Sequence, residues 1–229
     1  MKKILSFIMA ITILYGLMLS PSATGLTDTS NRPIFDDSGL VETMLENQTL
    51  IETGKAALRM RTSQTSLPVP KLYQNGGNSW DSVVLNNSGG VTIARAGCAL
   101  TSFTMIHRYL GGSLDPSGMN TRLGNAAYPL NYLTAANAFG YSILNYSRAD
   151  QSYTNTLNFC VGALLDNHPV LIGVRQGTAA NPTNTHFVVA RGYYSTSILI
   201  HDSNAQKNAL VLSDYTSYGW TVDRLYVFA

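Results

Sequence analysis

The order of its hydrophobic patterns is the feature that most constrains how this chain can fold. Before Pro169 the apolar residues recur at helical spacing, whereas after it short β-branched and aromatic runs are separated by turn residues. Helices followed by consecutive strands are typical of an α+β domain with a separate antiparallel sheet. The expected helices are residues 99–110, 133–139 and 155–167, and the expected strands are residues 170–174, 187–190, 198–201 and 225–228.

The first 25 residues have the pattern of a secretory signal peptide. Lys2 and Lys3 precede the uncharged apolar run 4–19, and a stretch of mostly small residues follows at 20–25. This run is short for a membrane span, which needs about 20 residues, although an uncleaved N-terminal anchor is the alternative. We therefore expect a secreted or cell-wall-associated protein with no stable membrane insertion after signal cleavage.

Residues 26–66 are expected to form an N-terminal extension of one or two helices, either a propeptide or a packing arm. Charge is dense in this stretch, and the following Pro68-Val69-Pro70 stops any helix. The main domain is then residues 67–229. Two short extended segments are expected near its start, at residues 69–74 and 91–94.

Charge and composition exclude several classes of function. Charged residues make up only 12% of the chain and the net charge is +2, against a usual charged share of about a quarter. The absence of a basic stripe in the sequence gives no support to nucleic-acid binding. Since the histidines show no metal-ligand spacing, we expect neither a metal nor a cofactor, and we expect a monomer.

Cys98 follows Gly97 at the start of the expected helix 99–110. A helix N-terminus favours a thiolate over a thiol, and its free N–H groups can hold an oxyanion. Cys98 is therefore a candidate nucleophile, against the alternative of a small buried hydrophobic residue. The other cysteine, Cys160, leaves a disulfide open, which would remove the nucleophile.

His186 is the best of the four histidines as a partner base for that thiol. His107 lies half a helical turn away from Cys98, on the opposite face, and His168 precedes a proline at a helix end, where a cation suits the last carbonyls. His186 instead opens an apolar run after a polar loop, at the mouth of a strand.

A hairpin that reverses at Tyr194 would pair His186 with Asp202 and place both on one face of the sheet, with His201 on the other. A carboxylate beside an imidazole can fix its tautomer and stabilise the imidazolium. Asn204 is an alternative for this orienting role. Asp202 has a purely structural alternative, as a carboxylate that stabilises a turn at the end of the strand.

Gln74 is a candidate for a second oxyanion donor, because it ends the first expected extended segment before a Gly/Asn-rich loop. The order of several motifs along the chain resembles that in the stand-alone relatives of the bacteriocin-processing (double-glycine leader) cysteine peptidases. These motifs are Gln74, Trp80, Gly97-Cys98-Ala99, the run 186–189 and His201-Asp202-Ser203. Those relatives belong to the papain-like superfamily, and the resemblance covers about residues 68–228.

The resemblance implies a papain-like fold, in which a helix that begins at the nucleophilic cysteine packs on an antiparallel sheet that carries the histidine and aspartate. It also implies a peptide-bond hydrolase with Cys98, His186 and Asp202 as a catalytic triad and Gln74 in the oxyanion hole. The expected function is thus a secreted cysteine peptidase that forms a thioester and acts on peptides or proteins, cell-wall peptides included. A cell-wall amidase or peptidoglycan endopeptidase and an inactive binding module are the alternatives.

Overall fold

The structure, a computed structural model, describes residues 64–229. The expected signal peptide and residues 26–63 of the expected extension lie outside this part of the chain. Among residues 64–229 no helix is both long and apolar enough to cross a membrane.

A six-stranded antiparallel sheet organises the domain, in the order β1-β4-β3-β6-β2, with β5 also paired to β4. Its central strand β3 is buried along most of its length, in agreement with the mostly apolar run at residues 170–174. The strands are β1 (Thr65–Ser66), β2 (Ile143–Ser147), β3 (Val170–Gly177), β4 (Pro182–Tyr194), β5 (Ser197–Asp202) and β6 (Thr221–Phe228).

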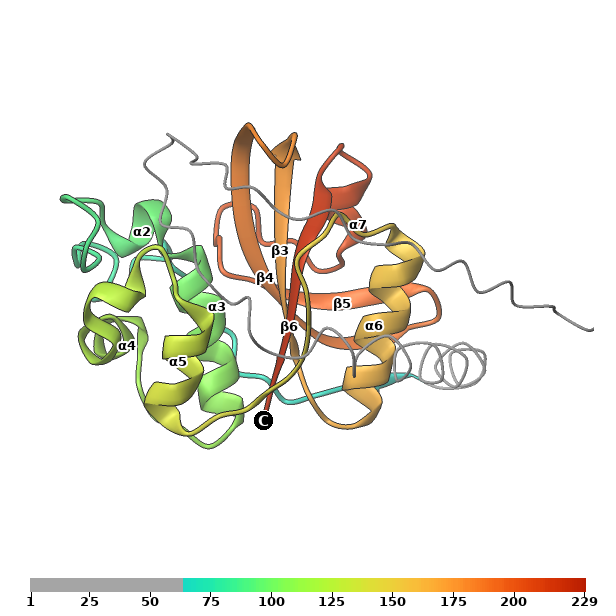
Figure 1. Cartoon of the computed structure of the whole chain (residues 1–229), viewed down its shortest axis with the longest axis horizontal. Helices are drawn as coiled ribbons and strands as arrows, with labels where there is room; N and C mark the ends of the chain where they lie inside the picture. Colours follow the sequence, from blue (N-terminus) through green and yellow to red (C-terminus); the bar gives the residue numbers. More distant parts are fainter. Residues whose placement is uncertain (1–63) are drawn as a thin grey trace, which may run out of the picture. The chain divides into compact units, whose positions relative to one another are not determined.

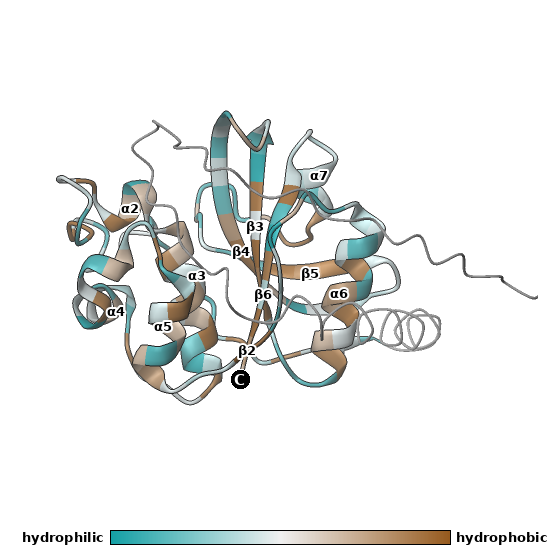
Figure 2. Ribbon diagram, viewed as in Figure 1, coloured by the Kyte–Doolittle hydropathy of each residue, from teal (hydrophilic) through white to brown (hydrophobic). Residues whose placement is uncertain are grey.

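Helices flank this sheet, with α2 to α5 gathered on one side and α6 on the other (Figure 1). Apolar residues concentrate along the strands, whereas the outer end of the β3–β4 hairpin is hydrophilic (Figure 2). The helices are α2 (Ile93–Ala96), α3 (Cys98–Tyr109), α4 (Pro116–Leu123), α5 (Tyr132–Phe139), α6 (Tyr153–Leu165) and α7 (Ser213–Thr216), with a 3₁₀ turn at Gly124–Ala127.

The α+β class predicted from the sequence is confirmed, and its antiparallel sheet is consistent with a papain-like fold. Helices α3, α5 and α6 lie within two residues of the predicted ranges, and strands β3 to β6 contain the four predicted strands. Local signals explain the boundaries well: Ser152 caps α6, and Gly140 ends α5 in the left-handed conformation with φ 72°.

Of the two segments predicted near the start of the domain, one is wrong and the other is partly right. Residues 69–74 form no strand. In the predicted extended segment 91–94, Thr92 is extended and forms a β-bridge with Val84, but residues 93–96 form the single helical turn α2. Helix α4 and strand β2 were not predicted. The signal for α4 is present, because Asp115 caps it and Pro116 occupies its first turn. A four-residue helix such as α2 is too short to show a hydrophobic period.

The register of the β4–β5 hairpin corrects the predicted pairing of His186 with Asp202. Asp202 pairs with Val188, because the chain reverses at Ser195–Thr196 rather than at Tyr194. A β-bulge between Ala190 and Gly192 then shifts the pairing by one residue. Without it, the turn would set Asp202 opposite Val189, on the wrong face of the sheet. Turn and bulge together move the register by two residues, so His186 and Asp202 share a face.

Candidate active site

Cys98 is the first residue of α3. The close packing of α2 against the residue before it, Gly97, restricts which side chain that position can carry. A Cβ atom at Gly97 would lie 2.6 Å from the carbonyl oxygen of Ile93 and 2.7 Å from its Cγ2. Any residue other than glycine would therefore force the two helices apart. Cys98 is half-buried and free, and Cys160 is a free, buried thiol in α6, so the two form no disulfide.

Helix α3 presents its cysteine to strand β4. Ser102 lies one turn after Cys98 on the same face of the helix, and its Oγ donates a hydrogen bond of 3.0 Å to the carbonyl oxygen of Phe187. Cys98 is therefore directed toward the same part of β4, where His186 is the neighbour of Phe187. The hydrogen bond and the charge of the Cys98 side chain are among the causes that raise the pKa of His186, in agreement with this direction of the thiol.

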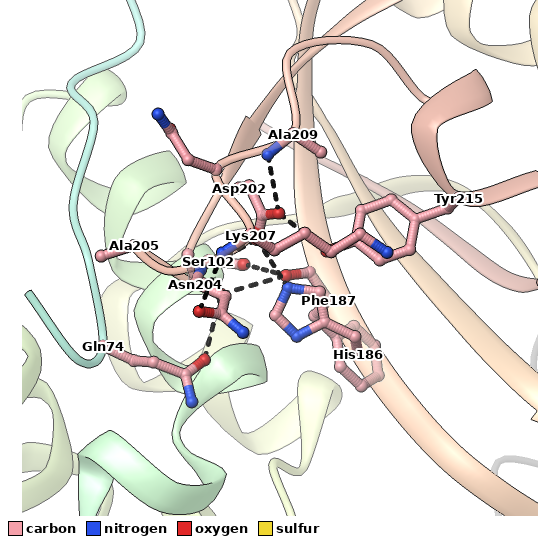
Figure 3. Close-up of polar contacts among 12 residues, drawn as sticks. Gln74, Ser102, His186, Phe187, Asp202, Asn204, Ala205, Lys207, Ala209 and Tyr215 are labelled. Atoms are coloured by element: carbon pink, nitrogen blue, oxygen red, sulfur yellow. Dashed lines mark hydrogen bonds and ion pairs between the residues drawn. The ribbon is translucent and has the colours of Figure 1, made fainter. Parts of the chain in front are cut away.

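His186 and Asp202 form a buried ion pair, with 2.7 Å between His186 Nε2 and Asp202 Oδ1 (Figure 3). Because Nε2 is engaged by the carboxylate, Nδ1 is the ring nitrogen that remains for the Cys98 thiol. His186 of β4 thus lies between the cysteine, which comes from α3, and the aspartate, which comes from β5.

Every hydrogen-bonding position of the Asp202 carboxylate is occupied. Oδ1 accepts from His186 and from the Asn204 N–H at 2.8 Å, while Oδ2 accepts from the Ala209 N–H at 3.1 Å and the Tyr215 hydroxyl at 2.7 Å. A fully buried carboxylate is costly unless it is paired in this way. Burial acts to raise the pKa of Asp202, but His186, the Asn204 amide and Tyr215 outweigh it and lower that pKa below its ordinary value.

The same contacts keep His186 protonated. Burial acts to lower the pKa of His186, but the hydrogen bonds and charges of Asp202 and Cys98 outweigh it and raise that pKa to about 9. An imidazolium at neutral pH is the partner that a neighbouring thiolate needs. The ring is held further by Tyr215, which stacks on it with 5.6 Å between centroids and 25° between planes.

The structure brings Gln74 to the segment just before Cys98, although the loop 75–97 separates them in sequence. Its Nε2 donates to the Ala94 carbonyl oxygen at 3.0 Å, and its Oε1 accepts from Ser203 Oγ at 3.2 Å. A backbone bond of 2.8 Å from the Gln74 N–H to the Ser203 carbonyl oxygen fixes the chain there. The second N–H of the side-chain amide is the candidate oxyanion donor, beside the Cys98 N–H at the helix start.

The alternative orienting residue, Asn204, has another role. Its side-chain oxygen accepts from Asn75 Nδ2 at 3.1 Å and from the Gln206 N–H at 2.9 Å, so it organises the loop after β5 rather than His186. His201 bonds the Val69 carbonyl oxygen at 2.9 Å. Within residues 64–229 no group of three His, Cys, Asp or Glu side chains is placed to hold a metal ion.

The sequence did not predict the residues that support the candidate catalytic groups, above all Tyr215. This residue lies in the four-residue helix α7, which has no amphipathic period to mark it, and it reaches Asp202 only through tertiary packing. Ser203 carried a weak signal, because it directly follows Asp202. Its Oγ contacts both the Gln74 side chain and, at 3.2 Å, the Phe187 carbonyl oxygen.

The chain is similar in sequence to one protein family and aligns with one solved structure. The model of the Peptidase C39-like family matches residues 66–221, which is more than half of the chain. A crystal structure from Bacillus anthracis, described as that of a C39-like peptidase, aligns over 72% of this chain and 98% of its own, with 14% sequence identity and a TM-score of 0.44. No curated protein matches the chain significantly.

Proposed function

Because the chain belongs to the Peptidase C39-like family, we propose that it is a cysteine peptidase with Cys98 as nucleophile, His186 as its proton partner and Asp202 as the orienting carboxylate. The observation that carries this proposal is the buried ion pair of His186 with a fully bonded Asp202, beside the helix that begins at Cys98 and bonds the neighbouring Phe187 through Ser102. Such an arrangement couples a thiol to a proton carrier whose position and tautomer are fixed.

In the first half of the reaction, the proton of the Cys98 thiol has already passed to His186, and the Cys98 sulfur attacks the carbonyl carbon of the scissile peptide bond. A carbon–sulfur bond forms, and the carbonyl oxygen becomes an oxyanion. The Cys98 N–H and the free N–H of Gln74 stabilise that charge. His186 then gives its proton to the amine, the carbon–nitrogen bond breaks, and a thioester remains on Cys98.

In the second half, neutral His186 takes a proton from water, whose oxygen attacks the thioester carbon. The oxyanion forms again in the same place, and the carbon–sulfur bond breaks to release the carboxylic acid. Asp202 keeps the imidazolium stable in both halves, because its carboxylate is ionised and cannot rotate away. This chemistry requires only groups of the chain itself and water.

Export through residues 1–25 and action on extracellular peptides or proteins, cell-wall peptides included, belong to the same proposal. They are supported by the basic and apolar pattern of the N-terminus and by the low content of charged residues.

Selective labelling tests the assignment of the nucleophile. Iodoacetamide should modify Cys98 much faster than Cys160, because Cys98 is half-exposed beside His186, whereas burial raises the pKa of the Cys160 thiol far above its usual range. Cys98→Ala should abolish peptide hydrolysis with the fold intact, and Cys160→Ala is the matched control that should retain it. Equal labelling of both cysteines, or hydrolysis by Cys98→Ala, would refute the proposal.

A further inference from the structure

A partly exposed arginine lies near the candidate active site, on the row of residues that crosses three neighbouring strands. Arg224 of β6 pairs with Gly173 of β3, which in turn pairs with Phe187 of β4. Because residues paired across strands share a face, the Arg224 and Phe187 side chains flank the position where Gly173 has none. Phe187 is also the residue whose carbonyl oxygen receives the hydrogen bond from α3.

The missing side chain at Gly173 is what lets Arg224 and Phe187 meet. A Cβ atom there would lie 2.9 Å from Phe187 Cε1 and 3.1 Å from Arg224 Cβ. In its absence, the guanidinium carbon of Arg224 lies 5.8 Å from the centre of the Phe187 ring, within the range of a cation–π contact. The guanidinium therefore has an aromatic surface beneath it.

Tyr132, at the start of α5, meets the same phenylalanine ring as this arginine. Its ring lies 6.1 Å from that of Phe187 and stacks on Tyr226 at 4.2 Å. Burial is the main cause that raises the pKa of the Tyr132 phenol; Arg224 acts against it through its charge and a hydrogen bond, and Cys98 adds to it. The phenol therefore lies beside the guanidinium, and the Phe187 ring that Tyr132 meets belongs to the residue that follows His186 in β4.

The acidic group beside Arg224 is shared with a second arginine, and the Arg224 side chain is partly exposed to solvent. Its Nε lies 3.5 Å from Asp223 Oδ2, but Asp223 also faces Arg175, whose Nε is 3.8 Å away. Arg175 is 4% exposed and held by Asp150 at 2.5 Å, whereas the Arg224 side chain is 39% exposed. Asp223 and Tyr132 are the partners that act on the guanidinium, which carries five N–H donors. Of the two arginines, Arg224 is the one whose side chain is exposed to solvent.

We propose that Arg224, Phe187 and Tyr132 form a substrate subsite beside Cys98 that binds an acidic side chain of the peptide substrate. This inference rests on the proposed peptidase function and adds a substrate class to it. A guanidinium already fixed by an aromatic ring, a phenol and a carboxylate loses little freedom when it binds a second carboxylate. The Phe187 ring offers apolar contact to the methylene groups of the same side chain.

Matched electrophiles test this subsite without a known substrate. The probes are iodoacetyl-glutamic acid amide and iodoacetyl-glutamine amide, each made with and without one glycine between the electrophile and the second residue. The Cys98 sulfur displaces iodide from each, so the paired probes differ only in one negative charge. Their rates with glutathione correct for intrinsic reactivity.

The native protein should react roughly fivefold faster with the glutamic acid probe at one of the two spacings, as expected for one charge-assisted contact at a partly exposed site. Arg224→Gln should bring the ratio to about one. Arg122→Gln is the matched control, because Arg122 also lies over an aromatic ring, Phe139, at 5.9 Å, and it should leave the preference intact.

The outcomes separate this inference from the proposed function. If Cys98 reacts with the glutamic acid and glutamine probes at equal rates at both spacings, the acidic subsite alone would be overturned. The same holds if the preference for the glutamic acid probe survives in Arg224→Gln. No reaction at Cys98 with any probe would overturn the nucleophile and the subsite together.

Discussion

Replacement of Tyr215 by phenylalanine removes one hydroxyl group and tests how Asp202 is held. The Tyr215 hydroxyl donates at 2.7 Å to Asp202 Oδ2, which otherwise accepts only the longer bond of 3.1 Å from the Ala209 N–H. Both Tyr215 and Asp202 are fully buried, so water cannot replace the lost donor. The substitution leaves a buried charge one bond short, with the packing of the ring unchanged.

A hydrogen bond to a charged group contributes about 1.5–3 kcal/mol, and we expect Tyr215→Phe to lower the free energy of unfolding by about 2 kcal/mol at neutral pH. For a domain of this size that corresponds to a fall in melting temperature of about 4–8 °C. Urea unfolding followed by tryptophan fluorescence measures the first quantity, and circular dichroism measures the second. Tyr218→Phe is the control, because Tyr218 is 75% exposed in the same region and should change neither.

The pH dependence of this loss identifies its cause. The pKa of Asp202 is lowered in the folded protein, so its contribution to stability is present above its unfolded pKa of about 4 and disappears as pH falls through the folded value. Since Tyr215 stabilises the ionised form, the difference between the native protein and Tyr215→Phe should be largest near pH 7 and shrink in acid. A variant as stable as the control, or a loss independent of pH, would refute this account of the carboxylate.

Two further predictions concern His186 and Gly97. Because the pKa of His186 is raised to about 9, its contribution to stability should be complete below its unfolded pKa of about 6.5 and be lost as pH rises through about 9. Peptide hydrolysis should decline over the same alkaline range, and a pH–rate profile without such a limb would contradict the assignment. Gly97→Ala should destabilise the protein and cut hydrolysis sharply, because the added Cβ collides with Ile93. Gly162→Ala, where no atom lies within 4 Å of the added Cβ, is its control and should be neutral or stabilising by up to about 1 kcal/mol; equal effects of both substitutions on thermal unfolding would disprove the steric argument.

Much of the fold was predictable because it follows from local patterns. The hydrophobic period of α3 and the mostly apolar run of β3 are properties of single segments, and the burial of those segments agrees with them. The pairing of β4 with β5 was predicted two residues out of register, since it depends on a turn at Ser195 with φ 54° and on a bulge. Neither feature has a strong signal in sequence, because serine at positive φ is uncommon.

The candidate site shows the same division between local and long-range causes. The position of Cys98 at a helix start follows from its own segment, whereas Gln74 meets Ala94 only because the loop 75–97 folds back on itself. The Ala209 N–H and the Tyr215 hydroxyl, which donate to the Asp202 carboxylate, likewise belong to the segment after β5, which folds back toward that strand. Contacts of this kind depend on tertiary packing, which neither spacing nor composition reveals.

The bulge that sets the phase of His186 and Asp202 also bears on where the domain begins. Strand β1 pairs with β4 beside that bulge, with Ser66 opposite Gly192. The Leu67 N–H bonds the Arg191 carbonyl oxygen at 2.6 Å, and Arg191 Nη1 donates to Ser66 Oγ at 2.6 Å. Residues 65–67 therefore brace the bulge from the neighbouring strand. Since one residue of slip there would move Asp202 to the other face of the sheet, we expect the proposed peptidase to need these residues, and we expect any cleavage that preserves this geometry to fall before Thr65.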